Sequence, residues 1–293
     1  MNWWQIIFNS GVTGSLYLIG AVGITMVYGL SRFPNFAHAE LMTLGAYIGY
    51  LVSEQLGMPY PLTFVAAFLA SGTVGVLSYV GIFKPLAARG ATIIHLMIAS
   101  IALGFIFRHI IQEAWGGSSL AYSARWSYYE IGAVRTATIR LWLIGTAVGT
   151  AILMHFVLSR TKIGKAIRAT SSNPDLALSS GINVHRVTLF AWFVGSALAG
   201  IAGVFRASIT RVYPMLGWDI LLPTFAVTIL GGIGSFYGAI AAAYIIGLAE
   251  NIGVTLLAEA GISTEYRMAI AFVILIIALI LRPQGLSRMF KGN

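Results

Sequence analysis

The chain has 293 residues, of which 58% are hydrophobic and only 9% are charged, and its formal net charge is +9 at pH 7. Soluble globular proteins average about 25% charged residues, so a soluble fold would lack the charges to cover its surface. The composition therefore excludes a soluble domain and predicts a polytopic membrane protein, whose backbone polar groups must pair internally. The absence of cysteine excludes disulfides and thiolate chemistry.

The apolar runs are long and continuous rather than alternating, which predicts helices of about 20 residues each. We place spans at 6–29, 37–53, 61–82, 93–112, 139–159, 187–206, 219–236, 238–257 and 266–281. The expected fold class is all-α, a transmembrane helical bundle of about 8–10 spans in a single domain over 1–293. The spans at 219–236 and 238–257 are joined by the stretch "GGIGSFYG", and one of them is a candidate for a re-entrant or broken element.

The stretch "SRFPNFAHAELMTLGAY" places Arg32, Asn35, His38 and Glu40 ahead of the second span and at its start. Pro34 disfavours a helical residue before it, so the chain is expected to break and restart there. Asn35 can cap the new helix, and a carboxylate favours its positive first turn. An ionisable group inside a span usually faces the bundle interior or a water path. The alternative, favoured for Glu40 alone, is an interfacial helix start whose polar groups are solvated or capping.

Basic residues orient the chain, because cytoplasmic loops carry an excess of Lys and Arg. Three clusters fall on one side if the N-terminus is outside and the C-terminus is cytoplasmic: Lys84 and Arg89; Arg160, Lys162, Lys165, Arg168 and Arg186; and Arg282, Arg288 and Lys291. The positive net charge is therefore assigned to loops at the membrane and not to a nucleic-acid site. Arg206 and Arg211 fall outside and count against the scheme.

The stretch "TKIGKAIRATSSNPDLALSSGI", at 161–182, contains two helix signals. "IGKAIRA" is short, basic and amphipathic. "NPDLALSSG" then has Asn173 as N-cap, Pro174 at the first helical position, Asp175 in the first turn and Gly181 just past the end. So short a helix is not stable alone and must dock. The loop at about 160–186 thus presents a helix to a cytoplasmic partner, or it is an ordinary solvated basic loop.

Two further features lie late in the chain. Glu250 and Asn251 form a polar pair in the eighth span, where a substrate role or interhelical hydrogen bonding is possible, and Glu250 is expected near water at the outer end. Gly195, Ala199 and Gly203 recur every fourth residue, which favours close helix packing inside one subunit over a dimer seam.

Several motifs for catalysis and for ligand or metal binding are absent from the sequence. No Gly-rich loop ends in Lys-Ser/Thr, no two of the five histidines have i, i+4 spacing, and no Ser stands in a G-x-S-x-G elbow. We therefore expect no catalytic residues, no metal site and no cofactor.

Three regions together resemble the permeases of the branched-chain amino acid ABC importers, in particular their shorter, first-type subunit. They are "NFAHAELMTLGAY", "GKAIRATSSNPDLALSSGINV" and the last third, with "TILGGIGSFYGAIAAAYIIGLAENIG" and "LRPQGL". The likeness covers nearly the whole chain. Ala39 and Tyr237 depart from it, since they stand where the family usually has Gly and Pro.

The resemblance implies a permease without enzymatic activity in a prokaryotic plasma (inner) membrane. It implies a second, different permease subunit, two cytoplasmic ATPase subunits that bind ATP, and an extracytoplasmic substrate-binding protein. The loop would be the coupling helix, in which Asn173, Pro174, Ala177 and Gly181 match the family motif. The residues expected to couple it to the ATPase are Gly164, Arg168, Asn173, Pro174, Asp175, Ala177 and Gly181. Residues expected along the translocation path are Asn35, His38, Glu40, Glu250 and Asn251.

The expected activity is import of branched-chain or related small amino acids by alternating access. Two alternatives remain open. The same machinery could carry urea, short amides or a sugar, because the binding protein carries much of the selectivity. An ion-coupled carrier or channel would need a relay inside the membrane, for which His38, Glu40 and Glu250 are the candidates.

Overall fold

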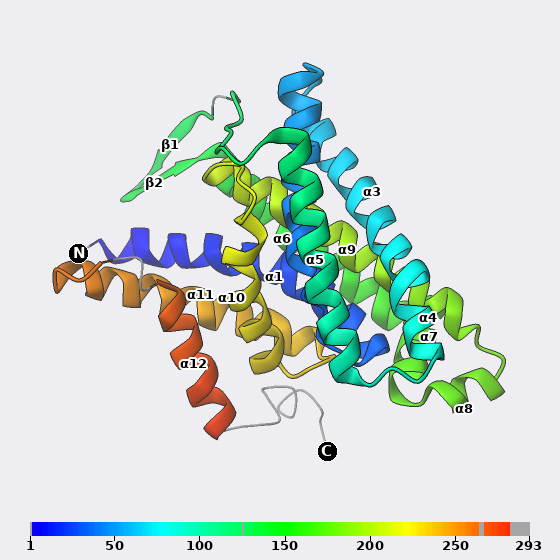
Figure 1. The fold of residues 1–293 in the computed structure, drawn as a ribbon. Helices are drawn as coiled ribbons and strands as arrows, with labels where there is room; N and C mark the ends of the chain where they lie inside the picture. The colour runs from blue at the N-terminus through cyan, green and yellow to red at the C-terminus, as the bar shows by residue number, and fades with distance from the viewer. Residues whose placement is uncertain (1, 125, 264–266, 282–293) are drawn as a thin grey trace.

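The structure is a computed structural model that describes residues 2–124, 126–263 and 267–281. Helices lie at each of the nine predicted spans, which confirms the helical transmembrane fold (Figure 1). The helices are α1 (Trp3–Ser31), α2 (His38–Tyr50), α3 (Pro61–Ser78), α4 (Lys84–Ala88), α5 (Ile93–Trp115), α6 (Thr138–Arg160), α7 (Lys162–Ser172), α8 (Pro174–Ser179), α9 (Val184–Ile209), α10 (Leu216–Gly231), α11 (Phe236–Glu259) and α12 (Arg267–Leu281). Two π-helical segments, Leu51–Gln55 and Tyr79–Phe83, continue α2 and join α3 to α4.

Not every predicted span is long enough to cross a membrane. In the described part of the chain, 6 helices are long and apolar enough, and they are α1, the continuous Pro61–Ala88 segment, α5, α6, α9 and α11. α10 has 16 residues with Pro223 inside it. It rises only about 24 Å, short of a hydrocarbon core of about 30 Å. α10 is thus the incomplete element that the sequence suggested near 219–257.

The core is built around α1 and α9. The most apolar window of α1 is 89% buried and that of α9 is 72% buried, whereas the corresponding windows of the other long helices are 22–28% buried. The peripheral helices therefore leave most of their apolar surface for lipid or for other chains.

Small residues make this core possible, as the four-residue spacing on α9 predicts. A Cβ atom on Gly203 would lie 1.8 Å from the carbonyl oxygen of Met42 in α2, and one on Gly195 would lie 2.7 Å from that of Gly23 in α1. These contacts are closer than any real Cβ makes, so only glycine lets the backbones approach here. The small-residue face of α9 therefore packs against α1 and α2 of the same subunit.

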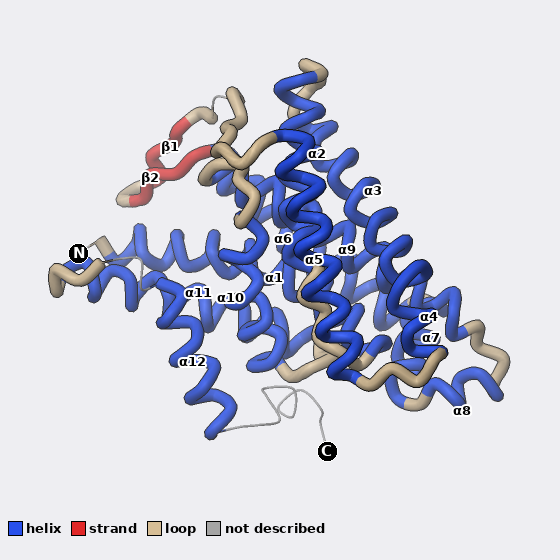
Figure 2. Tube along the Cα trace, viewed as in Figure 1, coloured by secondary structure: helices blue, strands red, loops and turns tan. Residues whose placement is uncertain are grey.

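The described residues between α5 and α6 form no helix. They contain a β-hairpin of strands β1 (Tyr128–Ile131) and β2 (Val134–Ala137), in which Tyr128 pairs with Ala137. Gly132 at the turn has φ +61°, a conformation that glycine adopts without steric cost. This hairpin is a small addition to an otherwise helical fold, and Figure 2 shows the two strands beside the helical bundle.

The first two basic clusters lie near one another. The Nζ atom of Lys84 is 3.5 Å from Nε2 of His185, next to Arg186, and Figure 1 shows α4, α7 and α8 at one end of the molecule, away from the N-terminus. The third cluster, Arg282, Arg288 and Lys291, lies outside the described residues, as does nearly all of "LRPQGL".

Candidate functional site

The short helix predicted between Asn173 and Gly181 is present as α8, and its boundaries follow from its caps. The side-chain Oδ1 of Asn173 accepts from the backbone N–H groups of Asp175 at 3.1 Å and Leu176 at 3.0 Å. Pro174 opens the helix, and Gly181 beyond its end has φ +79°. These are the start and stop that the sequence predicted.

α8 buries its small central residue and exposes a leucine on either side of it. Ala177 is only 3% exposed, whereas Leu176 and Leu178 are each 64% exposed. Two exposed leucines on a helix of 6 residues leave apolar area that water solvates poorly. The helix is thus anchored through Ala177 and, among the described residues, leaves the leucines that flank it exposed.

The preceding helix, α7, is held firmly against the end of α6. A Cβ atom on Gly164 would lie 2.2 Å from the carbonyl oxygen of Val157, so the two backbones are in contact. Thr161 caps α7 by accepting from the N–H of Gly164 at 3.1 Å. The guanidinium of Arg168 donates back to the carbonyl of Leu158. Gly164 and Arg168 therefore position α7, which together with α8 makes up the predicted coupling segment, 162–179.

The same segment is also bonded to the end of α1. The hydroxyl of Ser171 donates to the carbonyl of Gly29 at 2.8 Å, and Nη2 of Arg32 donates to the carbonyls of Ser171 at 3.2 Å and Ser172 at 3.3 Å. Arg32 has φ 56° and ends α1 in a left-handed conformation. It therefore stands at the break between α1 and α2 and joins that break to the coupling segment.

A cavity of about 550 Å³ separates α7 from α1 and from the turn between α10 and α11. Its lining includes Thr25 and Gly29 of α1, Arg168 and Ser171 of α7, and Gly234 of the turn. The coupling segment is thus bonded to α1 at one edge of an open space.

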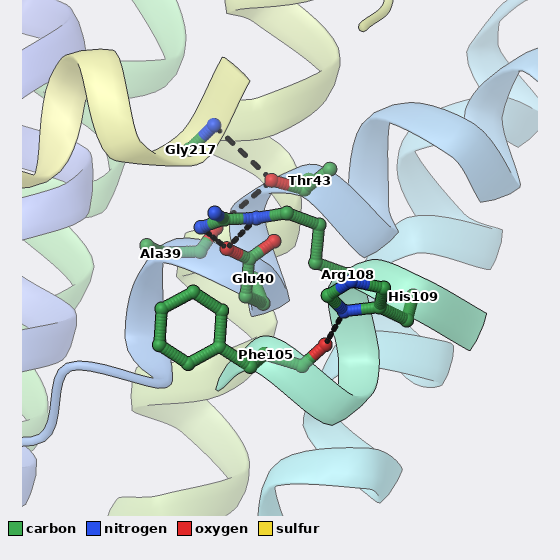
Figure 3. Close-up of polar contacts among 7 residues, drawn as sticks. All are labelled: Ala39, Glu40, Thr43, Phe105, Arg108, His109 and Gly217. Atoms are coloured by element: carbon green, nitrogen blue, oxygen red, sulfur yellow. Dashed lines mark hydrogen bonds and ion pairs between the residues drawn. The ribbon is translucent and has the colours of Figure 1, made fainter. Parts of the chain in front are cut away.

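Beyond the break, the polar groups at the start of α2 are buried. Nε of Arg108 in α5 donates to Oε1 of Glu40 at 3.0 Å, and Nη2 donates to the same oxygen (Figure 3). Glu40 is 0% and Arg108 8% exposed. The interpretation of Glu40 as a solvated or capping group is therefore wrong, because its carboxylate is removed from water and needs a buried cation.

Aromatic rings complete the surroundings of Arg108. The guanidinium carbon lies 5.3 Å from the ring centroid of Trp218 in α10 and 5.5 Å from that of Phe105 in α5. Thr43, one turn after Glu40, accepts from the N–H of Gly217 at 3.1 Å. This ion pair thus joins α2, α5 and the beginning of α10. The sequence reasoning missed Arg108, although a charged residue inside the 93–112 span was the available signal.

Asn35 and His38 belong to the same region. Oδ1 of Asn35 accepts from the N–H of Ala37 at 3.2 Å, which stabilises the turn before α2 and is not the predicted cap of α2 itself. His38 is 1% exposed, and its ring packs on α1, since a Cβ on Gly23 would lie 2.9 Å from its Cε1. Asn35, His38 and Glu40 are therefore all buried around the start of α2, where His38 faces α1 and Glu40 faces α5.

The other two predicted path residues lie elsewhere, on α11 against α1. The hydroxyl of Tyr17 donates to Oε2 of Glu250 at 2.6 Å, and Nδ2 of Asn251 donates to Oγ1 of Thr13 at 3.0 Å. Glu250 is 0% exposed, so its expected access to water at a helix end is wrong. The interhelical hydrogen bonds that the sequence offered as the alternative are present.

Comparisons with known proteins match nearly the whole chain to permeases of branched-chain amino acid transport systems. The family model described as "Branched-chain amino acid transport system / permease component" matches residues 6–279. A probable branched-chain amino acid transport permease protein LivH of Methanocaldococcus jannaschii is 30% identical over 97% of this chain and 92% of the relative. The high-affinity branched-chain amino acid transport system permease protein LivH of Escherichia coli is 28% identical over 96% of this chain and 94% of its own length.

Two more distant proteins also match most of the chain. The ribose import permease protein RbsC of Escherichia coli is 25% identical over 94% of this chain and 84% of its own length. The solved structure of PsaBC from Streptococcus pneumoniae in complex with Fab aligns with a TM-score of 0.53 and 16% identity, covering 100% of this chain and 96% of that one. The latter likeness concerns the fold alone. By its family match and its relatives, the chain belongs to the permease components of branched-chain amino acid transport systems.

Proposed function

We propose that this chain is one permease subunit of an ATP-driven importer that moves branched-chain or related small amino acids into the cytoplasm by alternating access. The proposal places the α8 end in the cytoplasm and the N-terminus outside, in a plasma (inner) membrane. The partners would be a second, different permease subunit, two ATPase subunits that bind ATP, and an extracytoplasmic substrate-binding protein. Membership of the permease family and the two exposed leucines of α8 support this arrangement.

The observation that carries the mechanism is the continuous set of contacts from α8 to the start of α2. α8 follows α7 directly, and α7 is bonded through Ser171 and Ser172 to Arg32 at the end of α1. A few residues later, α2 begins with the buried Glu40–Arg108 pair. A rigid movement of α8 with an ATPase therefore has a path to the break between α1 and α2, and the 550 Å³ cavity leaves α7 room to move against α1.

Bulky substitutions in α8 test this coupling. Ala177→Leu overfills a buried site, and Gly181→Val places a branched side chain at φ +79°. Both are expected to lower uptake per ATP hydrolysed in the reconstituted transporter. Gly90→Val is a matched control, since Gly90 has φ +81° with nothing within 4 Å of its Cβ position, as at Gly181, but lies outside the coupling segment. Normal coupling in both α8 variants would show that α8 does not transmit the ATPase movement.

A sugar is the second candidate cargo, because the ribose import permease aligns over most of the chain. Proteoliposomes that hold the permeases and ATPases, supplied with the binding protein, should take up labelled leucine when ATP is inside. Ribose, urea and acetamide serve as competitors in the same assay. Uptake of ribose in preference to leucine would reassign the cargo. Uptake without ATPase subunits, driven by an ion gradient, would favour a carrier.

A further inference from the structure

A second cavity, of about 150 Å³, lies between α1, α6, α9 and α11. Two arginines line it, Arg140 in the first turn of α6 and Arg206 in the last turn of α9. Thr13 of α1 and Asn251 of α11 also face it.

The two guanidinium groups have no carboxylate partner in the described part of the chain, where the observed ion pair is Arg108–Glu40. Nη1 of Arg140 donates to the neutral amide Oδ1 of Asn9 at 3.2 Å. Nε of Arg206 is buried and finds no acceptor among the described residues. Tyr213, which interacts with Arg206, donates its own hydroxyl to Asp219. Two half-buried cations thus line one space with no observed ion pair to a carboxylate among the described residues, while Asp219 accepts from Tyr213 and Glu250 from Tyr17.

The walls of this cavity match a particular kind of anion. Leu16, Leu143 and Ile209 supply apolar surface, while the arginines supply planar donors suited to a carboxylate. A half-buried guanidinium without a counter-charge is costly in an apolar environment, so an anion that enters gains both charge compensation and hydrogen bonds.

We propose that Arg140 and Arg206 form a binding site for the carboxylate of a small aliphatic acid, and that the transported amino acid is its ligand. The second half of this statement rests on the proposed function. Arg206 falls on the side predicted to be outside, where the positive-inside rule expects few basic residues. The proposed site accounts for this position, because the guanidinium lines a cavity and does not set the topology. Asn251 then faces the bound molecule as a neutral polar group.

Thermal unfolding of the full-length chain in nanodiscs tests the site directly. Sodium isovalerate has the carboxylate and a branched aliphatic chain, isovaleramide is its neutral isostere, and sodium chloride at equal ionic strength supplies an inorganic anion. Isovalerate and L-leucine should raise the unfolding midpoint with increasing concentration, whereas isovaleramide and chloride should not. Arg206→Gln and Arg140→Gln should each raise the apparent Kd for isovalerate about tenfold.

Controls separate a lost site from a lost fold. Arg211→Gln removes an exposed charge next to the same helix end and should leave the Kd unchanged. Arg206→Lys keeps the charge without the planar donors and should bind with intermediate affinity. An unchanged Kd in both Gln variants, no shift in the wild type, or an equal shift with chloride would overturn the carboxylate site. Binding of isovalerate without binding of leucine would overturn the assignment to the amino acid. Failure of leucine uptake by the reconstituted transporter refutes the proposed function but leaves isovalerate binding as it was.

Discussion

Arg32 at the end of α1 donates a hydrogen bond to the carbonyl of Ser171 in α7, a residue 139 positions later in the chain. This contact joins the coupling segment to the break in the bundle after which α2 begins. Because Arg32 is exposed and its acceptors are main-chain atoms, the contact can be removed without disturbing the core.

Substituting Arg32 should therefore reduce the coupling of ATP hydrolysis to uptake more than it lowers the stability of the fold. Arg32→Gln loses two hydrogen bonds worth about 0.5–1.5 kcal/mol each. We expect uptake per ATP to fall in proteoliposomes while the thermal midpoint of the purified chain changes little. Arg89→Gln, an exposed arginine in the connection after α4, is the control. Equal coupling in the two variants would remove Arg32 from the transmission path.

The exposed leucines of α8 should matter only when the ATPase is present. Leu176→Ser with Leu178→Ser removes two apolar side chains that are each 64% exposed, so the isolated permease should keep its stability. Its affinity for the ATPase subunits should drop at least about tenfold, since burying a leucine contributes about 1.5–3 kcal/mol. Co-purification and a titration of ATPase binding measure this. Leu56→Ser, at a position 57% exposed, is the matched control and should bind normally.

The Glu40–Arg108 pair should behave as a unit. Removing one partner leaves the other charge buried, which is expected to cost about 3–5 kcal/mol of stability. Glu40→Leu and Arg108→Met together should cost clearly less than the sum of the two single changes, as measured by denaturation in detergent micelles. Additive losses would mean that the two residues act independently. Transport by a stable double variant would show that the pair has a structural role and not a role in the path.

The bond between Tyr17 and Glu250 gives a separate test of an ion relay. Glu250→Gln keeps an oxygen that can accept from Tyr17 but removes the titrating group, so transport should continue. Tyr17→Phe loses the 2.6 Å hydrogen bond and should lower stability by about 0.5–2 kcal/mol. Loss of uptake in Glu250→Gln, with normal stability, would revive the ion-coupled alternative.

Glycine at 203 should be required by packing alone. Gly203→Ala forces a methyl group to within 1.8 Å of the Met42 carbonyl and should destabilise the chain by more than about 1–3 kcal/mol. Gly149→Ala in α6 meets nothing within 4 Å and should be neutral or slightly stabilising, because alanine favours helix. Thermal unfolding compares the two. Similar midpoints would contradict the close approach of α2 and α9.

The sequence by itself determined the helical membrane fold, since apolar runs of about 20 residues leave the backbone no other way to pair in lipid. It also determined α8, because the signals from Asn173 to Gly181 are local and act within a few residues of one another. Only the tertiary structure decided the partners of buried polar groups. Glu40 and Arg108 are 68 positions apart, and nothing local in the sequence tells which distant helix brings the cation. The same holds for Arg206, whose half-burial beside Arg140 depends on how α6 and α9 pack. Local caps are encoded by neighbours in sequence, whereas charge pairing depends on long-range packing that sequence periodicity does not specify.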